Sequence, residues 1–158
     1  HEKFSGKSQK YFDEELKEKY IAYVIETSAG ASRSFMAFLI DAYNEESVNN
    51  ETRVVLKFHP RLAPIKVAIL PLVNKDGMPE SAREIEKDLR PFMKVFYDSK
   101  GAVGRRYRRQ DEAGTPFCVT VDTQTLEDNT VTVRDRDSME QIRLKKDELL
   151  NYFIEKLR

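Results

Sequence analysis

The chain has 158 residues, of which 40% are hydrophobic and 34% are charged, which is typical of a globular protein with a highly charged surface. Its 27 basic and 27 acidic residues cancel to a formal net charge of zero, so nucleic-acid binding would have to depend on local basic patches. No apolar run approaches the roughly 20 residues that cross a bilayer, and the single Cys118 excludes an internal disulfide. We therefore expect a cytoplasmic protein that does not enter a membrane.

The first third of the chain changes from polar to apolar. Residues 1–19 are polar and predict a loop, whereas residues 20–26 are β-rich and apolar and predict a strand. Small residues over 27–33 indicate a turn, and residues 34–43 then predict a helix. This helix is apolar around most of its circumference, so we expect it to be buried in a larger body.

A polar segment and a proline-rich segment follow. Residues 45–52 predict a loop and residues 53–58 predict a short strand. Two prolines within residues 59–64 indicate a linker between domains. His59 lies in this turn without neighbouring ligands, so we predict no metal site.

From residue 65 onward, strands alternate with helices. The order β-α-β-α-β-β-β-α predicts an α/β fold with a mixed five-stranded sheet and flanking helices. The apolar stripe of the last helix should lie on this sheet; its predicted members are Leu149, Leu150, Phe153, Ile154 and Leu157. The predicted strands are 65–73, 94–98, 117–122, 130–134 and 141–144, the helices are 80–90, 102–112 and 145–158, and 127–129 is a hairpin turn.

A basic segment precedes the third of these strands. Arginine forks and an exposed aromatic ring at the mouth of a strand suit phosphates and unstacked bases. A solvated helix face, neutralised by Asp111 and Glu112, explains the pattern equally well. The candidate RNA-binding residues here are Arg105, Arg106, Arg108, Arg109, Tyr107 and Phe117.

Two further arginines, Arg134 and Arg136, lie two residues apart on or just past a strand and share one face if the strand continues. Such side chains can hydrogen-bond base edges. Pairing with the neighbouring Asp135 and Asp137, or with acids across the hairpin, is the alternative.

The turn before the first predicted helix holds Glu26, Ser28 and Arg33. A strand-to-helix turn can aim a carboxylate, a hydroxyl and a guanidinium into one cleft, although a plain turn explains the pattern as well. The chain contains no GxSxG motif, no Walker-type loop and no metal-ligand spacing.

Long stretches of the chain closely resemble glycyl-tRNA synthetases of the homodimeric class II type. The runs HPRLAPIKVAILPLVNKDG, YDSKGAVGRRYRRQDEAGTPFCVTVD and LEDNTVTVRDRDSMEQIR resemble the C-terminal anticodon-binding domain of that family. Upstream, HEKFSGKSQKYFDEE and YIAYVIETSAGASRSFMAFLIDAYNEE resemble the end of its catalytic domain, including the third class II motif. The resemblance implies a strand–helix remnant of the catalytic core over residues 1–60 and an anticodon-binding domain over residues 61–158.

The resemblance also implies a reaction, the ATP-dependent attachment of glycine to its tRNA. Glu26 and Ser28 match the residues that hold the ammonium of glycine, and Arg33 matches the arginine that contacts ATP phosphate. The family usually has proline where this chain has Thr27, so the loop should be less rigid. Arg134 matches the arginine that reads anticodon bases in related synthetases.

The partners that the resemblance implies are tRNA-Gly, glycine, ATP with Mg²⁺, and a second subunit in the full-length homodimer. Class II motifs 1 and 2 are absent from these residues, so we expect that this polypeptide alone does not activate glycine. Two other functions stay open. One is a non-catalytic nucleic-acid-binding accessory subunit that reuses the fold, and the other is a structural dimerisation module.

Overall fold

The computed structural model describes residues 1–158, and its packing divides the chain into two compact units, His1–Arg33 and Ser34–Arg158. The predicted domain boundary between residues 60 and 61 lies within the second unit. The assignment of the preceding residues to a catalytic domain stays a prediction.

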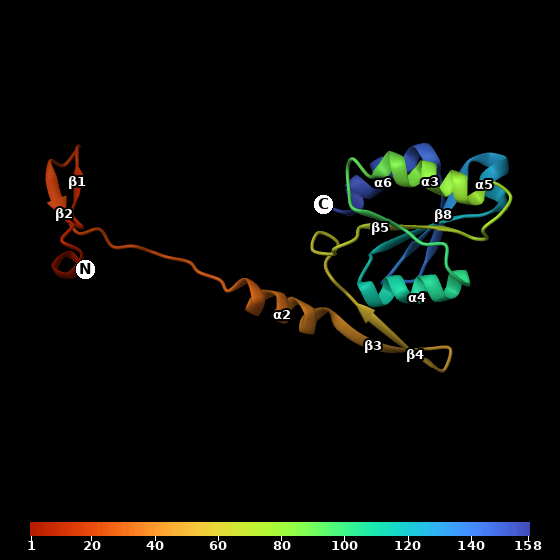
Figure 1. Ribbon diagram of the computed structural model, residues 1–158, viewed down its shortest axis with the longest axis horizontal. Helices are drawn as coiled ribbons and strands as arrows, with labels where there is room; N and C mark the ends of the chain where they lie inside the picture. The colour runs from red at the N-terminus through yellow and green to blue at the C-terminus, as the bar shows by residue number, and fades with distance from the viewer. The chain divides into compact units, whose positions relative to one another are not determined.

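The first unit contains one helical turn and one small hairpin (Figure 1). Helix α1 (Glu2–Ser5) is followed by strands β1 (Tyr11–Asp13) and β2 (Glu18–Tyr20), which pair antiparallel. The rings of Tyr11 and Tyr20 meet edge to face across this hairpin, with their centroids 5.9 Å apart. The hairpin occupies part of the segment that the sequence predicted to be a loop.

Residues 21–30 form neither helix nor strand, so the predicted strand over residues 20–26 is wrong. The segment has strand-forming composition, but no neighbouring strand is present to accept its backbone hydrogen bonds. Its apolar side chains are consequently exposed, and Ile25 retains 96% of its accessible surface.

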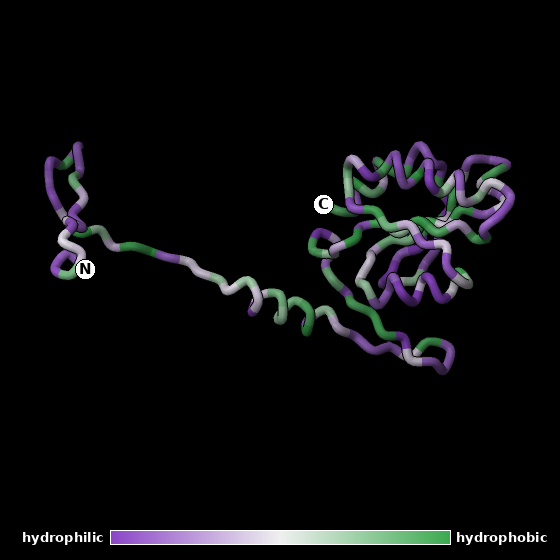
Figure 2. Tube along the Cα trace, in the orientation of Figure 1, coloured by the Kyte–Doolittle hydropathy of each residue, from purple (hydrophilic) through white to green (hydrophobic).

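The predicted helix over residues 34–43 is present as α2 (Ala31–Ala42). Ala42 is its only buried residue, whereas Phe35 and Ile40 are 65% and 68% exposed. Figure 2 shows the hydrophobic run along this helix. No other part of this chain therefore covers the apolar side chains of α2, which were expected to be buried.

An antiparallel hairpin follows, formed by β3 (Tyr43–Val48) and β4 (Glu51–Leu56). The predicted loop over residues 45–52 is thus wrong. Asn49 and Asn50 both adopt positive φ, at 52° and 64°, which suits a two-residue turn whose twist matches that of the strands. The polar side chains of β3 do not prevent strand formation, because most of them face solvent.

The predicted mixed five-stranded sheet is confirmed, with the strand order β6-β5-β7-β8-β9. The central strand β5 runs parallel to β6 and β7, and β7, β8 and β9 continue in antiparallel order. The strands are β5 (Val67–Pro71), β6 (Val95–Tyr97), β7 (Phe117–Val121), β8 (Thr130–Asp135) and β9 (Gln141–Lys145).

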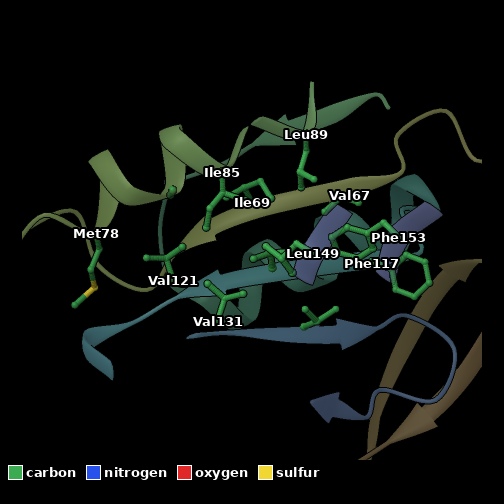
Figure 3. Packing of buried hydrophobic residues seen from close by; sticks show 13 residues of the cluster. Val67, Ile69, Met78, Ile85, Leu89, Phe117, Val121, Val131, Leu149 and Phe153 are labelled. Atoms are coloured by element: carbon green, nitrogen blue, oxygen red, sulfur yellow. The ribbon is translucent and has the colours of Figure 1, made fainter. Parts of the chain in front are cut away.

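Helices cover the two faces of the sheet unequally. Helices α3 (Met78–Leu89) and α6 (Leu149–Lys156) lie over one face, and α4 (Val103–Ala113) lies over the other (Figure 1). The main core fills the first face, where valines of β7 and β8 meet Ile85, Leu149 and other side chains of the two helices (Figure 3). The second face has a much smaller apolar cluster, built from Ala68, Leu70 and Cys118 with Tyr107 against it.

Two local predictions in this unit are wrong. The predicted hairpin turn at residues 127–129 is replaced by the end of a short helix, α5 (Thr123–Asp128). Asp122 and Thr125 form a capping box at its start, which supplies partners to backbone amides that a turn would leave free. In α6, Ile154 is 39% exposed and does not belong to the buried stripe, whereas Phe153 is fully buried.

Candidate nucleic-acid interface

Helix α4 carries the four arginines of the basic segment, and the structure buries one of them. Arg106 is 2% exposed and donates hydrogen bonds to the carbonyl oxygens of Pro71, Leu72 (3.1 Å) and Asp98 (3.4 Å). Its guanidinium thus joins the carboxyl ends of β5 and β6. This internal position corrects the prediction that Arg106 lies on an RNA-binding surface.

The other three arginines of α4 are accessible. Arg105 is exposed, and its side chain makes no hydrogen bond within the chain. Arg108 has a single long contact with Glu51, at 3.5 Å, and Arg109 pairs with Asp98 at 2.6 Å while its side chain remains 45% exposed. The exposed pair of Arg108 with Glu51 is worth no more than about 1 kcal/mol and exchanges readily with a phosphate. Arg109 is held more firmly, because Asp98 is buried and Arg109 also donates to the carbonyl oxygen of Lys100 at 2.7 Å.

Arg134 lies in β8 on the α4 side of the sheet and pairs with a helix residue, not with the neighbouring aspartates. Its Nη1 and Nη2 donate to the two carboxylate oxygens of Asp111 at 2.9 and 3.2 Å, a bidentate pair. The guanidinium also lies over the ring of Tyr107, 4.9 Å from its centroid. Arg134 is itself buried, with 6% of its surface exposed, and its Nε has no hydrogen-bond partner within the chain.

Arg136 is 2% exposed and fastens the end of β8 to surrounding backbone. It donates to the carbonyl oxygens of Gly114 and Phe58, each at 2.9 Å, and pairs with Asp137 at 2.8 Å. The alternative of pairing with a neighbouring acid therefore describes Arg136, and its predicted exposure to RNA is not observed.

Phe117 begins β7 on the face opposite α4 and belongs to the main core. It is 4% exposed, and its ring lies 5.5 Å from that of Phe153 (Figure 3). The ring is therefore covered by α6 and does not offer the stacking surface that the sequence predicted.

The α4 side of the sheet is left open over β8 and β9. Thr120, Thr132 and Arg143 lie in register across three strands on this side, because Thr120 pairs with Thr132 and Thr132 pairs with Arg143. We call this surface, with the adjoining Tyr107 and Gln141, the open sheet face. It borders a shallow hollow of about 260 Å³, lined by Leu72, Val103, Tyr107, Thr120, Asp122, Thr132 and Gln141.

Hydrogen bonds hold the polar groups of the open sheet face in place. The hydroxyls of Tyr107 and Thr120 are 2.5 Å apart, and burial raises the pKa of Tyr107, so its hydroxyl stays protonated at neutral pH. Arg143 donates to both oxygens of Asp122, at 2.7 and 2.8 Å. These bonds lower the pKa of Asp122 to about 2, against the opposing effect of its burial.

These threonines, Gln141 and Arg143 were not among the predicted site residues. The signal was present in the alternation over residues 130–133, TVTV, in which valines face the main core and threonines face the other side. A polar row of that length on an inner strand indicates a sheet face that no helix covers.

Comparison with known proteins assigns this unit to a family. Residues 66–156, more than half of the chain, match the family described as "Anticodon binding domain". The chain belongs to the anticodon binding domain family. The matched residues include the whole sheet, α4 and the open sheet face, whereas the hairpin β3–β4 precedes them.

Three relatives of this anticodon-binding chain are each named glycine–tRNA ligase. The chain is 54% identical over 157 residues to the protein of Treponema denticola, 57% over 152 residues to that of Rhodopirellula baltica and 54% over 162 residues to that of Corynebacterium efficiens. The alignments cover 96%, 93% and 99% of this chain but 35%, 28% and 35% of the relatives. The chain therefore spans about a third of the length of the relatives it matches.

The residues predicted to bind glycine and ATP lie before the family match. Glu26 and Ser28 belong to the exposed segment without regular structure, and Arg33 lies in the first turn of α2. No hydrogen bond joins the three side chains, so the structure does not assemble them into one cleft.

The described residues contain no group of three acidic, histidine or cysteine side chains that could hold a metal ion. None of the helices has the length and apolar character that crossing a bilayer requires.

Proposed function

We propose that this anticodon-binding chain recognises the anticodon of glycine tRNA, as part of a glycine–tRNA ligase. The family match and the names of the relatives support the assignment. The observation that carries the proposal is the open sheet face, where hydrogen-bonding side chains are fixed beside an arginine–tyrosine stack.

Arg134 would read a base edge from the border of this face. Because one N–H of each Nη is held by Asp111, the guanidinium cannot rotate, and the Nε–H, which has no partner within the chain, would donate the new hydrogen bond. The adjoining Thr120, Thr132 and Gln141 offer donors and acceptors to an unstacked base, which is the form in which proteins read RNA sequence.

The sugar-phosphate backbone would follow the accessible side of α4. Arg105, Arg108 and Arg109 supply three cations with accessible surface there, and the zero net charge of the chain makes such a local patch necessary. The buried Arg106 and Arg136 contribute to the shape of the interface and not to its charge at the surface.

In the whole ligase, residues 1–60 would contribute to the site for glycine and ATP. We assign Glu26 and Ser28 to the ammonium of glycine and Arg33 to an ATP phosphate, since a carboxylate suits an ammonium and a guanidinium suits phosphate oxygens. The exposed apolar side of α2 supports packing against further polypeptide of the catalytic domain. A homodimeric, cytoplasmic enzyme that uses Mg²⁺ with ATP completes the proposal, although the residues described here offer no cluster for the metal.

A binding titration tests the proposal. We expect the chain to bind tRNA-Gly tighter than the same tRNA with one changed anticodon base, by roughly 5-fold to 100-fold, as one lost base contact costs about 1–3 kcal/mol. Arg134→Lys should reduce this ratio, because an ammonium cannot make the bidentate pair that aims the side chain.

The matched variant is Arg105→Ala, which removes a cation from the same surface without touching the open sheet face. It should weaken binding to all tRNAs alike and reduce the salt dependence by about one unit of slope. Equal binding of duplex DNA and both tRNAs would contradict anticodon recognition and support an accessory subunit.

A further inference from the structure

One buried carboxylate connects the hairpin β3–β4 to the open sheet face. Asp111 in α4 is 1% exposed, and its Oδ2 accepts hydrogen bonds from Arg134 Nη2 at 3.2 Å and from Arg53 Nε at 2.9 Å. Its Oδ1 accepts from Arg134 Nη1 at 2.9 Å. Two strands, β4 and β8, and the helix α4 lie far apart in the sequence. All three therefore meet at the Asp111 carboxylate.

Arg53 is held on its other side by the hairpin and by the end of β8. Its Nη1 pairs with Glu46 of β3 at 2.6 Å, and its Nη2 donates to the carbonyl oxygen of Arg136 at 2.5 Å. The side chain is 1% exposed, so Arg53 has no surface with which to touch an RNA.

The geometry of the Asp111 carboxylate depends on both arginines. A bidentate pair requires the carboxylate plane and the guanidinium plane to coincide, and the Arg53 Nε bond fixes the rotation of that carboxylate. A buried ion pair keeps a unique geometry only when the remaining lone pairs are also satisfied. Loss of the Arg53 fork would therefore free Asp111 to rotate and would release Arg134 from its place over Tyr107.

We propose that Asp111 and Arg53 are positioning residues for Arg134, so that the hairpin β3–β4 sets how well the open sheet face discriminates between anticodons. The inference rests on the proposed function, because it takes Arg134 as a side chain that reads RNA. It adds that Arg53, which is buried and precedes the residues that match the family, controls how Arg134 reads the anticodon.

The decisive variant is Arg53→Lys, which keeps the buried positive charge but cannot donate at once to Asp111, Glu46 and the carbonyl of Arg136. We expect the guanidinium NMR signals of Arg134 to show faster rotation in the free chain. We also expect the ratio of tRNA dissociation constants, changed anticodon over glycine anticodon, to fall by roughly fivefold, a typical coupling for residues of one network. Asp111→Asn should produce the same two changes more strongly.

The control is Glu86→Gln, which removes the carboxylate of the pair with Arg83 on α3, over the opposite face of the sheet. It should change neither measurement. Unchanged Arg134 rotation and an unchanged ratio in Arg53→Lys would overturn the inference.

The two proposals fail separately. A wild-type chain that does not discriminate between anticodons contradicts the proposed function. The rotation of Arg134 in the free Arg53→Lys chain still decides the positioning role, since that measurement needs no RNA. Faster rotation supports the role, and unaltered rotation overturns it.

Discussion

Arg106 shows how a buried guanidinium is kept without a carboxylate of its own. Backbone carbonyls at the ends of β5 and β6 accept its hydrogen bonds, and its Nε has no partner. Burial accordingly lowers the pKa of this arginine. Burying the charge of Arg106 costs hydration free energy, but its hydrogen bonds fix the ends of β5 and β6 that border α4.

We predict that Arg106→Ala destabilises the second unit by about 2–4 kcal/mol, since it leaves buried carbonyl groups unpaired and a cavity behind them. The neighbouring Arg105→Ala removes the same side chain from an exposed position and should stay within about 0.5 kcal/mol of wild type. Urea unfolding followed by circular dichroism measures both. Similar stabilities of the two variants would contradict the assigned role of Arg106.

The pair of Asp122 with Arg143 makes stability depend on pH in the acid range. Because the folded-state pKa of Asp122 is lowered to about 2, its contribution is present above the unfolded pKa near 4 and is lost as the pH falls through the folded value. The contribution is at most about 2 kcal/mol, from a shift of nearly two pKa units.

The test compares wild type with Asp122→Asn by urea unfolding at several pH values. The difference in unfolding free energy should be constant near neutral pH and shrink between about pH 4 and pH 2. A difference that stays the same across this range would show that the carboxylate is not held as a low-pKa anion.

At the scale of elements, the hairpin β3–β4 is seated on the C-terminal end of α4. Gly114 caps this helix with a φ of +76°, and a Cβ added there would lie 2.5 Å from Phe58 Cδ2 and 2.9 Å from the carbonyl oxygen of Leu56. The close approach of β4 thus requires glycine for reasons of both space and backbone conformation.

Two glycine substitutions in the same helix should have opposite effects. Gly104→Ala meets nothing within 4 Å and should stabilise the chain by up to about 1 kcal/mol through helix propensity. Gly114→Ala should destabilise it by more than about 1 kcal/mol and increase amide exchange in β3 and β4. Thermal unfolding and hydrogen exchange measure the effects, and unchanged exchange in the hairpin would contradict the proposed seating.

Regular elements with a strong apolar pattern were predictable from sequence, and those defined by other signals were not. Strands β5 and β7 follow from continuous apolar runs, and helix α3 follows from its apolar stripe. Strand β3 is polar because it faces solvent, and α5 depends on capping by Asp122. The apolar residues 20–26 failed as a strand because pairing partners, not composition, decide whether a strand forms.

At the scale of the whole molecule, long-range pairing divides the arginines into buried and accessible groups. Arg53 and Arg134 meet Asp111 from 58 and 23 residues away, and Arg136 meets Phe58 from 78 residues away. The sequence placed these charges near one sheet but could not show which would turn inward. For the same reason, the alternation over residues 130–133 indicated a polar side of β8, but only the register of β7 with β8 brings Thr120 beside Thr132.

An anticodon that is read on the open sheet face must approach the second unit from the α4 side. Helices α3 and α6 close the opposite face over the main core (Figure 1), and that side contributes none of the residues proposed to contact the anticodon. The side of approach therefore separates anticodon reading on the open sheet face from any other mode of tRNA binding.

The most direct test is an NMR titration of the isotope-labelled chain with the anticodon stem-loop of tRNA-Gly, with a stem-loop carrying a changed anticodon as the control. We predict that the amide shifts specific to the glycine anticodon cluster on Tyr107, Thr120, Thr132, Arg134 and Gln141. Shifts that cluster on α3 and α6, or that are the same for both stem-loops, would contradict the account.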